Sequence, residues 1–291
     1  MPIIIDGKKT ANEIKIELTQ EVNQLKEKDI TPQLALLLVG NDPASEIYVS
    51  NKHKFCNDIG VASIIEKLPN NTTEKEILDR ISIWNNDKNI DGILVQLPLP
   101  KNINETKILL SINPNKDVDG FHPENIGKLV AGLPGYIPCT PLGIYELLKR
   151  YNIDTSAKHI VVLGRSNIVG KPIANLLVQK TKYANAIVTL CHSAAKNITD
   201  FTLSADIIIA AMGVPELIKK QHIKDGAVII DVGINSIADA TKQKGYRLVG
   251  DVDYNDVLDK VSAITPVPGG VGPMTIAMLL KNTIQSAKNK M

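Results

Sequence analysis

The chain has 291 residues, of which 44% are hydrophobic and 22% are charged. At about 150 residues per domain this length predicts two domains, and the composition is that of a globular protein. It excludes intrinsic disorder and fibrous rods. No apolar run reaches the roughly 18 residues of a membrane span, and no basic-then-apolar leader opens the sequence, so we expect no membrane association.

The charges are nearly balanced, with 33 Lys and Arg against 31 Asp and Glu and a net charge of +2. The basic residues form no dense cluster, so the sequence favours neither a nucleic-acid nor a lipid partner. The three cysteines, Cys56, Cys139 and Cys191, show no CxxC or CxxH spacing. We therefore expect no disulfide framework and no structural zinc, and a reducing, cytoplasmic location.

The first half of the chain alternates between helical and strand-like patterns. Helical spacing over residues 14–25 is followed by a buried strand over 34–39, and a helix is predicted over about 43–58. Asp42 can cap this helix, and Gly60 can end it. Two further strand-like runs flank a helical stretch around 74–85. Strands that alternate with helices predict βαβ units and a parallel sheet.

Residues 113–141 are rich in Pro, Gly and Asn and show little periodicity, which is typical of a domain boundary or a functional segment. A second alternating series starts with HIVVLG (159–164) and a helix from about Lys171, and further short strand-like runs follow. A Pro- and Gly-dense stretch, 264–273, precedes a closing amphipathic helix. The sequence thus predicts an α/β protein of two α/β domains, the second Rossmann-like.

The strongest cofactor signal is VVLGRSNIVGKP, in which a strand ends at Gly164 and a helix opens near Gly170. Backbone N–H groups at such a helix start hold phosphates. The spacing is not the usual G-x-G-x-x-G, so a simple strand-to-helix turn is the alternative interpretation.

The end of the next strand bears on the choice of cofactor. NAD-binding proteins usually place an acid there, whereas AIVTLC runs into His192 and Ser193. Arg165 in the turn can meet a 2′-phosphate bidentately, so the sequence favours NADP over NAD. His192 taken alone is interpreted as a packed or solvent-facing loop residue.

Four residues in the first half could carry chemistry. Tyr48 and Lys52 are four residues apart on the predicted helix and share a face, and a lysine in a partly desolvated site can move protons. The alternative interpretation is a solvated helix face, where Tyr and Lys at this spacing are common. Gln96 ends an apolar strand and can face a site at its carboxyl end. Taken alone, Asp119 beside Gly120 is interpreted as a turn residue.

Together these segments resemble one family. YVSNKHK, DGILVQLPLP, KDVDGF, PCTPLG, GRSNIVGKP, CHS, DVGIN and TPVPGGVGPMT occur in the order seen in the bifunctional methylenetetrahydrofolate dehydrogenase/methenyltetrahydrofolate cyclohydrolases. The resemblance spans nearly the whole chain. It implies NADP-dependent oxidation of 5,10-methylenetetrahydrofolate to the methenyl form and hydrolysis of that form to 10-formyltetrahydrofolate, reactions of one-carbon metabolism and purine biosynthesis.

The resemblance also implies roles for individual residues. Lys52 matches the proton-transfer group of the hydrolysis, and Gln96 the glutamine that pairs with it and assists water activation. Tyr48 matches the tyrosine that stacks on the folate and orients the lysine. Asp119 matches the aspartate that binds the pterin ring. Further folate-pocket positions are matched by Val95, Leu97, Pro266 and Gly269.

For the cofactor, the matching positions are Gly164, Arg165, Ser166, Ser193 and Ile234. The family often follows its CHS motif with a lysine, whereas this chain has two alanines, so Arg165 carries more of the NADP preference.

The family pattern further implies an arrangement. Residues 1–141 plus 273–291 form a folate-binding catalytic domain and residues 142–272 the NADP-binding Rossmann-like domain, with the folate substrate, possibly polyglutamylated in the cell, in the cleft between them. A homodimer is expected from the family alone. Three alternatives stay open: a dehydrogenase without hydrolase activity, a non-catalytic dinucleotide or folate sensor, and a shikimate-type Rossmann dehydrogenase.

Overall fold

In a computed structural model, which describes residues 1–242 and 245–290, the chain divides into two compact units. The first unit comprises residues 1–11 and 140–275, and the second comprises residues 12–139 and the chain from residue 276 onward. The chain passes from one unit to the other within helices α1 (Gly7–Lys26), α6 (Cys139–Arg150) and α10 (Val271–Lys288).

The expected domain boundaries differ from these units at the amino terminus. Residues 1–11 belong to the first unit, because strand β1 (Ile3–Ile4) pairs in parallel with β11 (Ala263–Ile264). A strand of two residues is too short to show a hydrophobic period, so the sequence pattern gave no sign of it.

The first unit is built on a parallel sheet of six strands among the described residues, in the order β1-β11-β8-β7-β5-β6. Its other strands are β5 (His159–Leu163), β6 (Ile187–Cys191), β7 (Ile207–Ala210) and β8 (Val228–Asp231). The chain runs from β5 to β6 on one side and then returns to β7 on the other side of β5. The carboxyl ends of β5 and β7 therefore form a topological switch point, where open α/β sheets bind their ligands.

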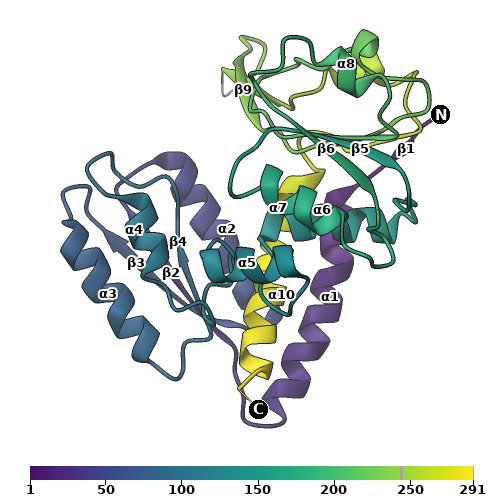
Figure 1. The fold of residues 1–291 in the computed structure, drawn as a ribbon. Coiled ribbons are helices and arrows are strands. Elements are labelled where there is room, and N and C mark those ends of the chain that lie inside the picture. The colour runs from purple at the N-terminus through teal and green to yellow at the C-terminus, as the bar shows by residue number, and fades with distance from the viewer. Residues whose placement is uncertain (243–244, 291) are drawn as a thin grey trace. The chain divides into compact units, whose positions relative to one another are not determined.

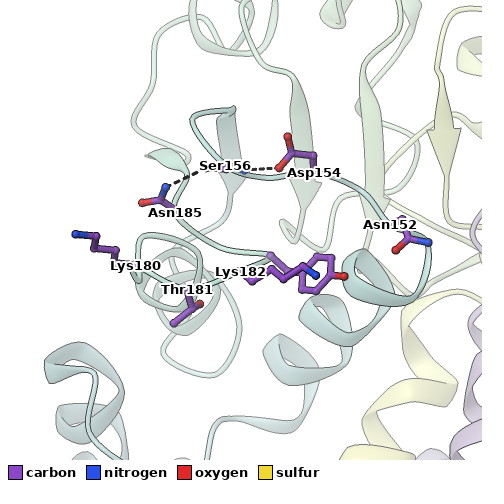
Figure 2. Close-up of a pocket in the computed structure, with 8 residues that line it drawn as sticks. Asn152, Asp154, Ser156, Lys180, Thr181, Lys182 and Asn185 are labelled. Atoms are coloured by element: carbon purple, nitrogen blue, oxygen red, sulfur yellow. Dashed lines mark hydrogen bonds between the residues drawn. The ribbon is translucent and has the colours of Figure 1, made fainter.

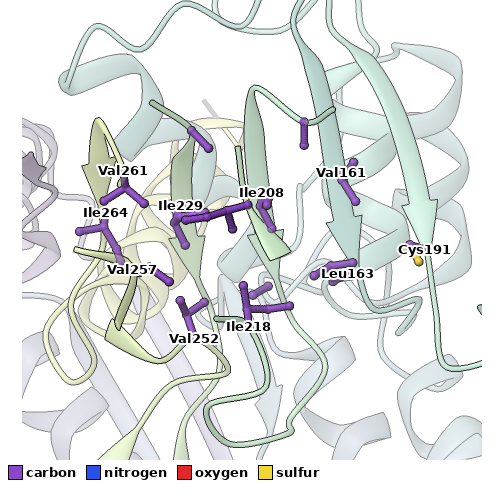
Figure 3. Packing of buried hydrophobic residues seen from close by; sticks show 14 residues of the cluster. Val161, Leu163, Cys191, Ile208, Ile218, Ile229, Val252, Val257, Val261 and Ile264 are labelled. Atoms are coloured by element: carbon purple, nitrogen blue, oxygen red, sulfur yellow. The ribbon is translucent and has the colours of Figure 1, made fainter. Parts of the chain in front are cut away.

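Short helices and a hairpin complete the first unit. They are α7 (Gly170–Leu177), α8 (Thr199–Thr202), η1 (Lys220–His222), α9 (Tyr254–Val257) and the antiparallel pair β9 (Asn235–Ala238) and β10 (Tyr246–Val249). Helix α8 lies on one side of the sheet, and α6 and α7 lie on the other (Figure 1). On one face, branched side chains such as Val161, Ile208 and Ile229 form a continuous buried cluster (Figure 3). With both faces covered, the strands read as near-continuous apolar runs.

The second unit holds a parallel sheet in the order β3-β2-β4. Its strands are β2 (Gln33–Val39), β3 (Ala62–Leu68) and β4 (Gly92–Val95), and its helices, besides parts of α1 and α10, are α2 (Pro43–Ile59), α3 (Glu74–Asn86), α4 (Glu105–Leu110) and α5 (Pro123–Ala131). Helices α3 and α4 cover one face, where Ile77, Trp84 and Ile108 pack on Leu37 and Ile93. This βα alternation was predicted from the sequence and is confirmed.

Helix α2 follows its sequence signals closely. Asp42 accepts a hydrogen bond from Ser45 N at 2.8 Å, Pro43 opens the helix, and Gly60 ends it in the left-handed conformation with φ 81°. The predicted helix over about 43–58 is confirmed. Helix α5 was not predicted, because its nine residues lie within the segment whose Pro and Gly content masked the helical period.

Helix α10 is fastened to the second unit through its last turns. Asn282 Nδ2 donates to Val118 O at 2.9 Å and to Ile137 O at 3.1 Å. Ser286 Oγ donates to Asp91 O at 2.6 Å. No described helix is both long enough and apolar enough to cross a membrane.

Candidate active site

Lys52 and Gln96 meet at the carboxyl end of β4. Lys52 lies on α2 and is only 9% exposed, and Gln96 directly follows β4. Lys52 Nζ donates to Gln96 Oε1 at 2.8 Å, and Gln96 Nε2 donates to Leu97 O at 2.7 Å. The amide is thereby fixed with its oxygen toward the lysine, and one of the N–H bonds of Lys52 Nζ points at this oxygen.

Asp119 belongs to the same end of the sheet. Residue Asp117 bridges Ile93 of β4 in parallel, so the chain leaving Asp117 runs toward the end of β4 where Gln96 lies. The Asp117 carboxylate accepts hydrogen bonds from Phe121 N, His122 N and Asn125 Nδ2, which holds this loop.

Charge and burial oppose each other in this cluster. Burial lowers the pKa of Lys52, and the nearby Asp119 carboxylate opposes that shift. Burial raises the pKa of Asp119, an effect that Lys52 opposes. The two groups therefore lie closer in proton affinity than the free side chains do, which suits a proton-transfer site.

Cys139 is a member of this cluster that the sequence did not single out. The thiol donates to Val118 O at 3.3 Å and lies near Asp119, and burial raises its pKa well above the usual value. It is therefore a neutral thiol that packs against the Asp119 loop. Its place in PCTPLG next to a helix start was the available signal.

The other predicted residues of the second unit surround this cluster. Tyr48 is one helical turn before Lys52 on α2 and is 43% exposed, so its ring is accessible. Val95 is buried at the end of β4, and Leu97 is partly buried. The peptide bond between Leu97 and Pro98 is cis. The structure brings Lys52, Gln96 and Asp119 together, as the predicted site requires.

The phosphate turn of the first unit follows β5. Gly164 has φ +116°, and a Cβ there would lie 2.1 Å from Ala211 O at the end of β7. Ser166 Oγ accepts from Val169 N at 3.1 Å and from Gly170 N at 3.2 Å. Among the described residues, the backbone N–H groups of residues 165–168 have no hydrogen-bond partner. These exposed donors at the switch point fit a phosphate.

Arg165 faces His192, which follows β6. Arg165 Nη1 lies 3.4 Å from His192 Nε2, and His192 Nδ1 accepts from Ala194 N at 3.2 Å. The Arg165 guanidinium thus lies beside the imidazole of the residue that follows β6. A shared anionic acceptor such as a 2′-phosphate fits this arrangement. The interpretation of His192 as an ordinary loop residue missed this contact, although its place directly after a Rossmann strand was a signal.

The remaining predicted residues of the first unit are more dispersed. Ser193 is exposed beside His192, and Ile234 is 48% exposed just after β8. Pro266 is partly buried, and Gly269, with φ +108°, accepts from Lys8 N at 2.9 Å. No hydrogen bond between described residues joins these four positions to the phosphate turn. In the described part of the chain, no group of His, Cys, Asp or Glu is placed to hold a metal ion.

A separate polar cavity of about 630 Å³ lies on the same unit (Figure 2). Its lining comes from the segments that precede β5 and β6, including Asp154, Ser156, Lys180 and Asn185. Asn185 Nδ2 donates to Ser156 Oγ at 3.0 Å. The cavity is thus at the amino ends of the parallel strands, opposite to the switch point, and is not the dinucleotide site.

These features define a class of protein: a two-unit α/β enzyme with a Rossmann-type dinucleotide turn and a buried lysine–amide pair. Comparison with known proteins specifies it further. Residues 5–119 match the tetrahydrofolate dehydrogenase/cyclohydrolase catalytic domain, and residues 138–291 match the NAD(P)-binding domain of the same family. The chain therefore belongs to the tetrahydrofolate dehydrogenase/cyclohydrolase family.

Individual relatives agree with this assignment. The chain is 58% identical over 287 residues to the bifunctional protein FolD of Chlorobium chlorochromatii, covering 98% of this chain and 97% of that relative. The crystal structure of the FolD enzyme from Campylobacter jejuni is 47% identical over 100% of both chains, with a TM-score of 0.95. The Trypanosoma brucei enzyme, solved with NADP and an inhibitor, is 38% identical over 99% of this chain and 98% of that chain, with a TM-score of 0.94.

The expected family, the two-domain α/β fold and both activities are confirmed. The protein is a bifunctional, NADP-dependent enzyme that oxidises 5,10-methylenetetrahydrofolate to 5,10-methenyltetrahydrofolate and hydrolyses the latter to 10-formyltetrahydrofolate.

The phosphate turn generates a prediction. Gly164→Ala places a methyl group against Ala211 O and strains a backbone with φ +116°, so the turn must move. We expect NADP+ affinity to fall by about 10-fold or more, measured by calorimetric titration. Gly226→Ala is the matched control, since Gly226 also has a positive φ of +75° but open space around it. Equal NADP+ affinities for both variants would contradict the expectation.

Proposed function

We propose that Lys52, Gln96 and Asp119 carry out the hydrolytic half of the reaction. The observation that supports this most is the partly buried hydrogen bond of 2.8 Å between Lys52 Nζ and Gln96 Oε1, with the Asp119 charge nearby. A buried lysine with a lowered pKa releases its proton more readily than a free lysine does. An amide whose orientation is fixed by Leu97 O keeps that amine in place.

In this proposal, Lys52 moves one proton of the attacking water and the solvent takes the other. The Lys52 amine removes a proton from water as the water oxygen bonds to the methenyl carbon, which lies between two nitrogens of the folate. The resulting ammonium returns this proton to N5 as the bond between the carbon and N5 breaks. The hydroxyl group left on the carbon loses its proton to the solvent as the C=O double bond forms, so the carbon remains on N10 as a formyl group, one proton is released overall, and Lys52 is again neutral. Gln96 orients the amine through both steps.

The oxidation makes different demands on the chain. NADP+, when bound, accepts a hydride from the methylene carbon, and the two flanking nitrogens stabilise the cation that is left. The protein has no proton to move in that step, so its task is orientation. We propose that Gly164, Ser166, Ser193 and Ile234 bind the cofactor and that Arg165 selects the 2′-phosphate, supported by the donors that converge at the phosphate turn.

The folate contacts are proposed on the same basis. Tyr48, with its accessible ring one turn from Lys52, stacks on the substrate, and Asp119 binds the pterin ring as well as acting on the charge of Lys52. The further lining positions are Val95, Leu97, Pro266 and Gly269.

The division of labour predicts separable activities. Lys52→Met keeps the volume of a buried side chain and removes the amine, so we expect hydrolysis of methenyltetrahydrofolate to fall by about 100-fold or more. The oxidation should change much less, because no step of it uses the amine. Both rates are read from the methenyl and NADPH absorbances. The exposed Lys54→Met serves as control. Equal losses of both activities with normal folate binding would contradict these roles.

The charge of Asp119 predicts a pH effect with a definite sign. Asp119 raises the pKa of Lys52, so Asp119→Asn lowers that pKa further. The neutral amine then persists to lower pH, and we expect the acidic limb of the kcat profile for hydrolysis to move down by about 1 pH unit. The exposed Asp58→Asn, on the same helix, should leave the limb in place. A limb that stays or moves up in Asp119→Asn would show that Lys52 does not act as the base.

We also propose a homodimer formed along β6. This strand is at the end of the sheet order, and among the described residues its outer edge pairs with no strand. Ile187 is 64% exposed and Leu190 is 37% exposed. Native proteins rarely leave an apolar edge strand uncovered, and a two-fold axis pairs such an edge with its copy.

Mutation of this edge tests the dimer. Ile187→Asp introduces a charge at the proposed contact, so we expect the mass measured by light scattering to fall from two chains to one. Ile83→Asp, at another exposed isoleucine, on α3 (57% exposed), should remain dimeric. A wild-type protein that is monomeric, or an Ile187→Asp variant that stays dimeric, would reject the proposed interface.

A cytoplasmic location belongs to the same set of proposals. It is supported by the three cysteines, which are all free and buried in the described structure. The product, 10-formyltetrahydrofolate, would then supply formyl groups to transfer reactions such as those of purine biosynthesis.

A further inference from the structure

Two buried carboxylates in the first unit have no role in the chemistry described above. Asp231 ends β8 and is 3% exposed, and Asp251 follows β10 and is 0% exposed. Among the described residues, neither forms an ion pair with a lysine or arginine. Burying a carboxylate without a positive partner is costly unless hydrogen bonds stabilise it. The donors that bind these two carboxylates therefore indicate which parts of the structure the carboxylates hold.

Asp231 binds three backbone N–H groups. Oδ1 accepts from Gly233 N and from Asp251 N, each at 3.0 Å, and Oδ2 accepts from Val252 N at 3.0 Å. Burial raises the pKa of Asp231 to about 7 although these donors oppose the shift. One carboxylate thus joins the loop after β8 to the loop after β10.

Asp251 extends this connection to the end of β7. Oδ2 accepts from Met212 N at 2.6 Å and from Gly213 N at 2.9 Å, and Oδ1 accepts from Asn235 Nδ2 at 2.9 Å. Residues 211–213 directly follow β7, whose carboxyl end forms the switch point together with Gly164. Ala211 O is the atom that a Cβ on Gly164 would strike, so the two loops are in van der Waals contact.

Ile234, the proposed cofactor contact, lies between the residues that the two carboxylates hold. Gly233 N binds Asp231, and the Asn235 side chain binds Asp251. The fit leaves no spare room: a Cβ on Gly233 would lie 2.3 Å from Asp251 Oδ1, and one on Gly250 would lie 1.8 Å from Asp231 Oδ2. The Ile234 side chain is nevertheless 48% exposed, on a backbone fixed from both sides.

We propose that Asp231 and Asp251 form a carboxylate clamp, a pair of positioning residues that fixes the loops 211–213 and 232–235 for the dinucleotide. The clamp acts through backbone N–H groups and touches neither substrate nor cofactor. It deepens the proposed function, on which it rests for the identity of the ligand. A loop set in place before binding lowers the entropy cost of binding, so the clamp contributes to cofactor affinity and orientation and leaves hydrolysis alone.

Isosteric variants test the clamp. Asp251→Asn turns one acceptor oxygen into an NH2 group, which leaves Met212 N and Gly213 N or the Asn235 amide facing a donor. We expect the KM and the dissociation constant for NADP+ to rise by about 10-fold or more, and hydrolysis of added methenyltetrahydrofolate without NADP+ to stay within about twofold. Asp231→Asn should act in the same direction, and the exposed Asp225→Asn should change neither value.

Hydrogen exchange gives a readout that does not depend on activity. In Asp251→Asn, the amides of Met212 and Gly213 should exchange about 10-fold faster or more, while those of the β5 core keep their protection. Asn235→Ala removes a single donor from the clamp and should show a smaller change of the same sign, which covers the case in which an aspartate variant does not fold.

The outcomes separate the clamp from the function it serves. Parallel loss of both activities, or unchanged exchange at Met212 and Gly213, would overturn the clamp. If the wild type binds no NADP+, the cofactor assignment is wrong. The hydrogen exchange of Met212 and Gly213 then tests on its own whether the clamp holds the loop.

Discussion

The buried amino group of Lys52 is the constraint on which the candidate site of the second unit depends. Its desolvation lowers its pKa, and the protein compensates with one oriented amide oxygen and one carboxylate rather than with a full ion pair. A close salt bridge would have held the proton on the lysine, and an apolar pocket would have removed it. The intermediate arrangement leaves a lysine that releases its proton more readily than a free lysine does, which suits the role proposed for it in the addition of water and the ring opening.

The parallel topology explains why these groups converge. Gln96 follows β4, and Asp119 follows the segment that bridges β4 in parallel, so both are delivered to the same sheet end. Lys52 reaches that end from α2, the helix between β2 and β3. The same rule works in the first unit, where the phosphate turn follows β5 and the loop 211–213 follows β7. In both units the carboxyl ends of the parallel strands set the position of the candidate site, and the loops that follow them carry its side chains and N–H donors.

The sequence predicted the features that depend on contacts between residues close together in the chain, and it did not predict those that depend on distant residues. Asp42 and Gly60 bound a helix through contacts within a few residues, so α2 was predicted nearly to the residue. The turn at Gly164 was likewise local. In contrast, β1 takes its partner from residue 263 onward, and the approach of His192 to Arg165 depends on two strands pairing in register. Alternation and capping carry no information about such distant contacts. The Lys52–Gln96 pair was found because the motifs of a known family supplied what the spacing alone left open.

The two units stabilise buried carboxylates in opposite ways, and the difference matches the work of each site. Asp119 lies near a lysine, so its charge and that of Lys52 depend on one another, and a proton taken by one changes the affinity of the other. Asp231 and Asp251 are held by N–H donors, which fix a carboxylate geometrically but have no proton to release at neutral pH. Hydrolysis needs protons to move, whereas hydride transfer needs two rings to be held in place. In the roles proposed above, a lysine–carboxylate pair in one unit and a carboxylate pair held by hydrogen bonds in the other meet these two requirements within a single chain.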